Sequence, residues 1–180
     1  MLRRLAPLLA ALALLAGCAY APRGLEGVPE GEGWVAFPLR GWLAEGRGRP
    51  EAMVACLSAA CPHRLAVALI TLSGDDAATT AQVLRDPERL GRYLRGRDRA
   101  DTDPRRAAIR TQVAVRALRE EGLPGFAITL SRADGARPPA YGGAVGRIEG
   151  DELRVVLAAG DDEAAVLAGL RGVVAARLAR

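Results

Sequence analysis

In the stretch ELRVVLAAGDDEAAVLAGLRGVVAARL, residues 152–178, the hydrophobic pattern changes from that of a strand to that of a helix, which indicates how the domain is built. Residues 152–159 form a short apolar run that is typical of a buried strand. Asp161 or Asp162 then supplies the N-cap of a helix over 162–178. Its apolar side chains recur at steps of three and four: Val166, Leu167, Leu170, Val173, Val174 and Leu178. The sequence therefore predicts that this helix lies on a sheet.

Two further short apolar runs, 126–132 and 140–148, come before this stretch. Turn-forming residues separate the three runs, first between Arg132 and Pro139 and then at 149–151. This spacing predicts an antiparallel meander of three strands that leads directly into the last helix.

The first half of the domain supplies more strands. Residues 34–45 contain three aromatic side chains and favour an opening strand, which Pro38 places at an edge or a bend. The runs 51–58 and 64–72 are both apolar, and we expect them to pair as a hairpin.

Two helices are predicted between this hairpin and the meander. The stretch 76–95 is typical of a helix that Asp86-Pro87 interrupts, with aspartate as the N-cap and proline at the first helical position. The same dipeptide, Asp103-Pro104, opens a second predicted helix over 104–121. Gly122 then ends that helix.

The order of strands, two helices, three strands and a helix predicts a single α+β domain over 33–180, with an antiparallel sheet and helices packed on it. It resembles the PsbP and DcrB type of α/β/α sandwich in its opening Trp34 to Trp42, in the meander over 126–159 and in the helix over 162–178. This resemblance implies a three-layer fold that occurs in bacterial lipoproteins. Such a fold carries little information about function.

The N-terminus has the pattern of an exported precursor. Arg3 and Arg4 precede an apolar stretch from Leu5 to Ala16, which is too short to span a bilayer. The stretch ends in Leu15-Ala16-Gly17-Cys18, which resembles the lipobox at which bacterial lipoproteins are cleaved. Residues 1–17 are therefore interpreted as a signal peptide.

The resemblance to lipoproteins implies that Cys18 becomes a lipidated N-terminus. Apart from this covalent lipid, we expect no cofactor. Two or three acyl chains would anchor the protein stably in a membrane. Residues 18–32 are rich in Gly, Pro and Glu and are interpreted as this N-terminus and a flexible tether. The same resemblance implies that Ala19, which follows the cysteine where an aspartate would favour retention at the inner membrane, favours the periplasmic face of the outer membrane, if the cell is Gram-negative.

The charge balance argues against a nucleic-acid partner. All 25 basic residues are arginine, and the chain has a net charge of +4. Removal of Arg3 and Arg4 with the signal peptide leaves 23 arginines against 21 acids. A net charge of +2 is too small for a typical nucleic-acid-binding domain.

Cys56 and Cys61 are the two thiols that remain once Cys18 carries lipid. The compartment outside the cytoplasm is oxidising, so we predict a structural disulfide between them. A redox-active pair is an alternative, although the spacing is wider than Cys-x-x-Cys and no thioredoxin pattern surrounds it. A metal site with His63 as third ligand is a second alternative, although its spacing matches no zinc module. We therefore expect no metal.

No catalytic pattern stands out from the sequence. His63 is the single histidine, and none of the three serines in the mature chain lies in a Gly-x-Ser-x-Gly turn. The aspartate pairs at 75–76 and 161–162 both lie where a helix is predicted to start, and capping together with compensation of the helix dipole explains them. Gly142, Gly143 and Gly146 are explained as bulges or places of close backbone approach. We assign no catalytic residue and expect no enzymatic activity.

The stretch 85–121 is rich in arginine, with 11 arginines and 7 acids. Arg85, Arg89 and Arg92 are spaced as on one helical face, and so are Arg106 and Arg110. They form a candidate contact for an anionic partner, such as lipopolysaccharide phosphates, anionic lipid or an acidic protein. An ordinary solvated face laced with acids is the alternative.

These observations lead to the hypothesis of a membrane-anchored envelope lipoprotein that acts as a non-catalytic binding or structural module. Its partner would be an envelope protein or an anionic envelope component. A small-ligand-binding or accessory protein that assists an envelope complex is one alternative. A thiol oxidoreductase or a hydrolase is another.

Overall fold

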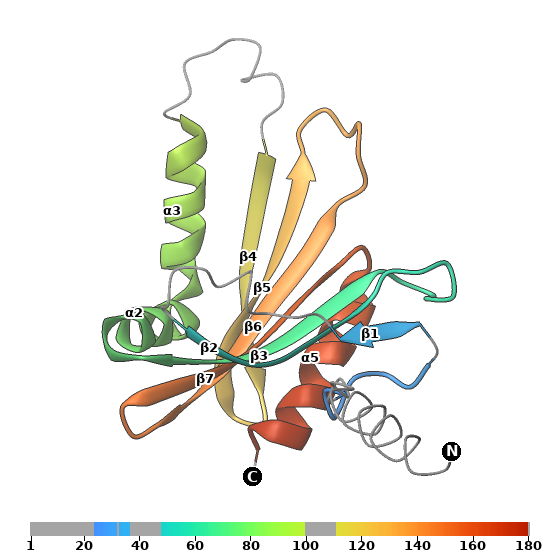
Figure 1. Ribbon diagram of the computed structural model, residues 1–180. Helices are drawn as coiled ribbons and strands as arrows, with labels where there is room; N and C mark the ends of the chain where they lie inside the picture. The colour runs from blue at the N-terminus through green and yellow to red at the C-terminus, as the bar shows by residue number, and fades with distance from the viewer. Residues whose placement is uncertain (1–23, 32, 37–47, 100–110, 180) are drawn as a thin grey trace, which may run out of the picture.

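The computed structural model describes residues 24–31, 33–36, 48–99 and 111–179. Seven strands form one sheet in the order β1-β2-β3-β7-β6-β5-β4, and every neighbouring pair is antiparallel (Figure 1). The strands are β1 (Trp34–Ala36), β2 (Gly48–Cys56), β3 (Leu65–Ser73), β4 (Thr111–Glu120), β5 (Leu123–Arg132), β6 (Ala140–Glu149) and β7 (Glu152–Gly160). The helices are α2 (Gly74–Arg85), α3 (Pro87–Arg99) and α5 (Glu163–Arg177). The predicted α+β class with an antiparallel sheet is confirmed.

The meander and the last helix form as the sequence predicts. Strands β5, β6 and β7 pair in succession, and α5 follows β7. Asp162 is the N-cap of α5, because its Oδ1 accepts a hydrogen bond from the backbone N–H of Ala165 at 2.8 Å. All members of the predicted stripe are buried except Leu167, which is partly buried.

The predicted helix over 104–121 is wrong where the structure describes it, because Thr111–Glu120 is strand β4 at the edge of the sheet. Val113 and Val115 share one face of the strand and are partly buried, and β-branched residues favour a strand. Glu121 and Gly122 both have positive φ, 51° and 78°, as a two-residue hairpin turn requires. Gly122 therefore turns the chain from β4 into β5 and does not end a helix.

The hairpin and the helices that follow it match their predictions closely. Strands β2 and β3 pair from Gly48↔Leu72 to Cys56↔Leu65, with an irregularity between Pro50 and Ala52. Helices α2 and α3 are separate, and the break falls at Asp86, as the sequence predicts. Of the predicted opening strand over 34–45, β1 is the described part.

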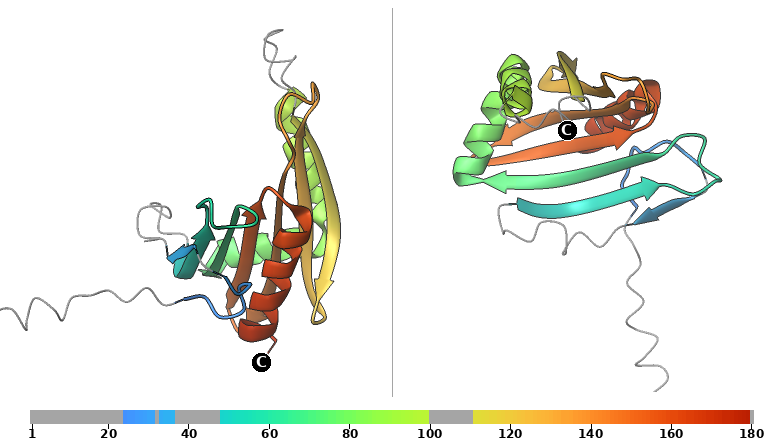
Figure 2. Two further views of the ribbon diagram at one scale, coloured as in Figure 1. Left: turned by 90° about the vertical axis from the view of Figure 1, so that its right-hand side faces the viewer. Right: turned by 90° about the horizontal axis from the view of Figure 1, so that it is seen from above.

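Helices cover both faces of the sheet, which makes the fold an α/β/α sandwich (Figure 2, left). One face packs on α5 through a cluster that includes Val67, Val145 and Val156. The opposite face packs on α2 through a second cluster around Leu84 and Val155. Adjacent strand residues point to opposite faces, so the same strands supply both cores.

Glycines of β6 let both helices approach this strand closely. A Cβ at Gly143 would lie 2.6 Å from Leu170 Cδ1 of α5, and one at Gly146 would lie 2.6 Å from Leu84 Cδ1 of α2. The interpretation of these glycines as places of close approach is therefore confirmed, and what approaches them is helix side chains.

The N-terminal segment 24–31 packs against the domain, so the predicted tether over 18–32 is too long. Leu25 is only 2% exposed and belongs to the α5-side core, and Val28 packs against the same core. Gly27 has φ of +92°, and a Cβ there would lie 2.2 Å from the carbonyl oxygen of Gly172 in α5. The segment is rich in Gly, Pro and Glu, so its composition gave no indication that Leu25 is buried in the core. Between Cys18 and the packed segment, residues 19–23 remain as the predicted tether.

Candidate functional site

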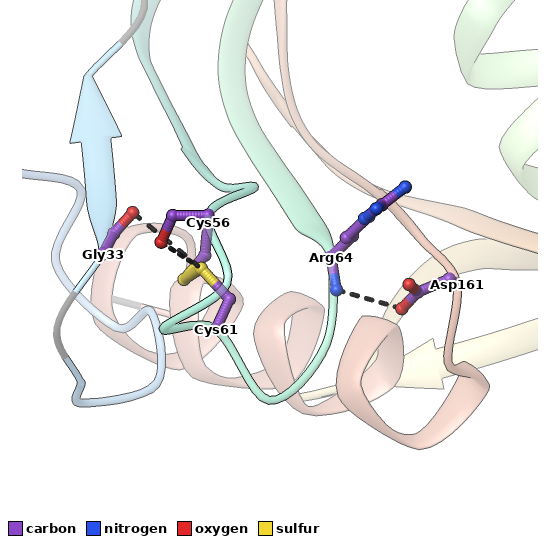
Figure 3. The surroundings of a disulfide bond; sticks show 6 residues. Gly33, Cys56, Cys61, Arg64 and Asp161 are labelled. Atoms are coloured by element: carbon purple, nitrogen blue, oxygen red, sulfur yellow. Dashed lines mark hydrogen bonds between the residues drawn. A yellow bond between two sulfur atoms is a disulfide. The ribbon is translucent and has the colours of Figure 1, made fainter.

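The two cysteines meet at the end of the β2–β3 hairpin. Cys56 ends β2, and it forms a disulfide with Cys61 in the loop that leads to β3 (Figure 3). Cys61 Sγ lies 3.9 Å from the carbonyl oxygen of Gly33, just before β1. At the base of the loop the backbone N–H of Arg64 donates to Asp161 Oδ1 at 3.0 Å. The disulfide therefore closes a short loop that contacts β1 and is held at its base by the start of α5.

The surroundings of this disulfide do not assemble a nucleophile and a base. Ser58 Oγ lies 3.5 Å from Cys61 Sγ, and the sulfur of a disulfide has no proton to give, so the hydroxyl is the donor. His63 is exposed on the loop. In the described ranges, no group of three or more His, Cys, Asp or Glu side chains is placed to hold a metal ion. The absence of enzymatic activity stays a prediction.

The predicted arginine face is divided between two helices. Arg85 lies in the last turn of α2, whereas Arg89 and Arg92 lie on α3, beyond the break at Asp86. Arg89 Nη1 donates to Gln82 Oε1 at 3.1 Å, and Arg92 Nη2 lies 3.8 Å from Asp86 Oδ2. Arg89 and Arg92, which are both exposed, are hereafter called the α3 arginine surface. Arg106 and Arg110 lie outside the described residues.

A polar cluster that the sequence analysis missed joins four elements, β2, β3, β7 and α5. Glu51 of β2 accepts hydrogen bonds from Arg154 of β7, with Nε–Oε1 and Nη2–Oε2 distances of 3.0 Å each. Thr71 of β3 donates to Glu51 Oε1 at 2.7 Å, and Arg177 Nη2 of α5 lies 3.5 Å from Glu51 Oε2. Burial acts to raise the pKa of Glu51. The hydrogen bonds from Arg154 and Thr71 and the charges of Arg154 and Arg177 outweigh that effect and lower this pKa.

The same cluster ends α5. Arg154 Nη1 donates to the carbonyl oxygen of Arg177 at 3.1 Å, and Arg147 Nη1 donates to that of Leu178 at 2.6 Å. Carbonyl groups at a helix C-terminus lack partners within the helix and favour cations. The sequence could have indicated this cluster, because alternate residues of a strand share one face and Arg154 therefore lies on the same face as the buried Val156 and Ala158. A charge on a buried face requires a partner.

Replacement of Glu51 by glutamine is expected to lower the free energy of unfolding by about 1–2 kcal/mol at pH 7, since the cluster is partly exposed. The folded-state pKa of Glu51 lies below its ordinary value of 4.5. The stabilisation by its carboxylate is therefore complete above about pH 4.5 and is lost as the pH falls through the lower folded pKa. Urea unfolding of both proteins between pH 3 and pH 7 measures this difference.

A matched control is Glu152→Gln, because Glu152 pairs with Arg49 in a more exposed ion pair. We expect that change to cost less than about 0.5 kcal/mol. A Glu51→Gln effect that is equally large at pH 3 and pH 7 would contradict the assigned role of the carboxylate.

Comparisons with known proteins add little to this description. No protein-family model matches the chain, and no curated protein matches its sequence. A solved structure described as LpqN, involved in cell envelope biogenesis of Mycobacterium tuberculosis, aligns with 83% of this chain and 76% of that chain. The sequence identity is 15% and the TM-score is 0.36, a likeness that carries no argument about function. In the described part of the chain, no helix is long and apolar enough to cross a membrane.

Proposed function

We propose that this protein is an envelope lipoprotein that is anchored through Cys18 and whose α/β/α domain is a non-catalytic binding or structural module. The observation that carries the proposal is the run from Leu5 to Cys18, a short apolar segment that ends in Leu-Ala-Gly-Cys. The packed domain begins only a few residues later, at Leu25. A chain built in this way stays close to the membrane that holds its lipid.

Among the described residues, the reactive side chains at the β2–β3 loop and in β2 already bond to other parts of the fold, which supports a non-catalytic role. Cys56 and Cys61 are paired with each other, and Glu51 is engaged by Arg154 and Thr71. Groups that are used in this way stabilise the fold. The α3 arginine surface, by contrast, is exposed and carries charge, and it remains our candidate contact for an anionic partner.

Replacement of Cys18 by alanine is expected to abolish lipidation and to leave an unprocessed precursor, because the thiol that would carry the lipid is absent. Mass spectrometry of the membrane fraction is expected to find a wild-type chain that starts at Cys18 and carries acyl groups. Cys61→Ser is a control that keeps Cys18 and removes a different cysteine, and its product should still be lipidated. A wild-type chain cleaved at another residue and released without lipid would refute the proposal.

A further inference from the structure

We infer that the disulfide-closed loop between β2 and β3 is a second membrane contact, and that Leu57 at its start enters the interface of the bilayer that holds the lipid on Cys18. This inference rests on the proposed function, since it requires the lipid anchor. It assigns the loop, and not the α3 arginine surface, to the anchoring membrane.

The first step is the position of the loop relative to the anchor. The segment 24–31 is fixed to the domain by Leu25 and by the contact of Gly27 with Gly172. Six Cα–Cα steps separate Cys18 from Gly24, so the chain between them spans at most about 22 Å. The described chain then continues through Gly33, which contacts Cys61, into β1. The loop therefore belongs to the part of the domain that the anchor holds near the membrane.

The second step is the chemistry of the loop. Leu57 is 51% exposed, and the following Ser58, Ala59 and Ala60 are exposed and uncharged. Val35 on the neighbouring β1 is 52% exposed. From Ala52 to Gly74 the sequence contains no acid. At the base of the loop, away from Leu57, the exposed Arg64 lies beside Asp161, whose Oδ1 accepts its backbone N–H. An uncharged tip with an exposed leucine at its start suits the boundary between acyl chains and headgroups.

The third step excludes the other charged surface from this membrane. Figures 1 and 2 place α3 beside β4, at the edge of the sheet opposite β1, and on the face opposite α5. Leu25 packs on the α5 side. Three layers of helix, sheet and helix are about 30 Å thick, which exceeds the reach of about 22 Å from Cys18 to Gly24. With the loop against the anchoring bilayer, the α3 arginine surface lies on the far side of the domain, where a partner could reach it.

The test uses the full lipidated protein in vesicles of phosphatidylethanolamine and phosphatidylglycerol. A photo-crosslinking amino acid, benzoylphenylalanine, replaces Leu57 in one variant and Tyr93 of α3 in a control; both side chains are more than half exposed. A third variant carries it at Leu130, an exposed apolar position on β5 that the inference leaves in water. We expect position 57 to crosslink to lipid roughly tenfold more than positions 93 and 130, because insertion of an apolar side chain is that favourable.

A charge-reversal control and a flotation assay distinguish failure of this inference from failure of the lipid anchor. Addition of Arg89→Glu and Arg92→Glu to the variant labelled at position 57 should leave its crosslinking unchanged. The inference would be overturned if the protein floats with the vesicles but position 57 crosslinks to lipid no more than positions 93 and 130. That result would still be consistent with the lipid anchor. Protein that carries no lipid and does not float with the vesicles would overturn the proposed function, and this inference with it.

Discussion

Replacement of Leu170 by alanine is expected to lower the free energy of unfolding by about 3–5 kcal/mol, near the upper end for a buried leucine. Leu170 is 0% exposed and lies in the core between α5 and the sheet. Its Cδ1 occupies the space over Gly143 of β6, where a Cβ would lie 2.6 Å away. Because residue 143 has no side chain that could move into the vacated volume, the cavity should persist. Urea denaturation of the purified full-length chain measures this loss of stability.

A double-mutant cycle makes this prediction sharper. Gly143→Ala alone should also destabilise the protein, since its methyl group meets Leu170. In the double variant the new methyl group occupies part of the space that Leu170→Ala opens. We expect the combined loss to fall short of the sum of the single losses by about 1 kcal/mol. The relief is partial, because the Phe126 carbonyl oxygen also lies 3.0 Å from a Cβ at this position.

Gly146→Ala is the matched control for this cycle. Its methyl group would meet Leu84 of α2 on the opposite face of the sheet, also at 2.6 Å. Leu170→Ala opens no space there, so these two losses should add. Additive losses for Gly143 and Leu170 would show that the two residues do not share a packing site.

Replacement of Gly27 by alanine is expected to detach the N-terminal segment from α5 and to leave the rest of the domain folded. The new Cβ would lie 2.2 Å from the Gly172 carbonyl oxygen, and φ of +92° is unfavourable for alanine. The decrease in the free energy of unfolding cannot exceed the free energy with which segment 24–31 docks on α5, because detachment of the segment relieves the strain at residue 27. Burial of Leu25 sets this energy at about 2–3 kcal/mol.

Limited proteolysis together with urea unfolding distinguishes detachment from global unfolding. Gly27→Ala should speed cleavage within residues 24–33 and leave β2 to α5 resistant. Gly24→Ala is the control, because a Cβ there meets nothing within 4 Å. Detachment lengthens the tether, so the same change should reduce lipid crosslinking at position 57. Identical behaviour of the Gly27 and Gly24 variants would refute the docking.

Local patterns were sufficient for most of the secondary structure. The apolar stripe from Val166 to Leu178 and the cap at Asp162 are properties of a single segment, and they predict α5 without knowledge of its partners. The break at Asp86-Pro87 is likewise local, because proline has no backbone N–H and restricts the residue before it. The disulfide between Cys56 and Cys61 follows from a short separation at a hairpin end.

Strand β4 shows where local reasoning failed. The aspartate-proline dipeptide before it and the glycine after it are typical of helix ends, and they outweighed the β-branched Val113 and Val115. Pairing with β5 along its whole length decided in favour of the strand, and Glu121-Gly122 formed the turn. Neither feature is visible in the segment alone, since register with a partner strand is a non-local property.

Patterns within short stretches of sequence were sufficient for the α+β class, for the meander with its final helix and for the pairing of Cys56 with Cys61, because each depends on residues close together in the chain. The three-dimensional fold was needed to show that Glu51, Arg154 and Arg177 meet and that Leu25 packs in the α5-side core. It was also needed to show that the β2–β3 loop and helix α3 lie toward opposite edges of the sheet. These contacts join residues up to about 150 positions apart. Their formation depends on strand order and on which face each helix covers, and no local pattern of residues encodes either.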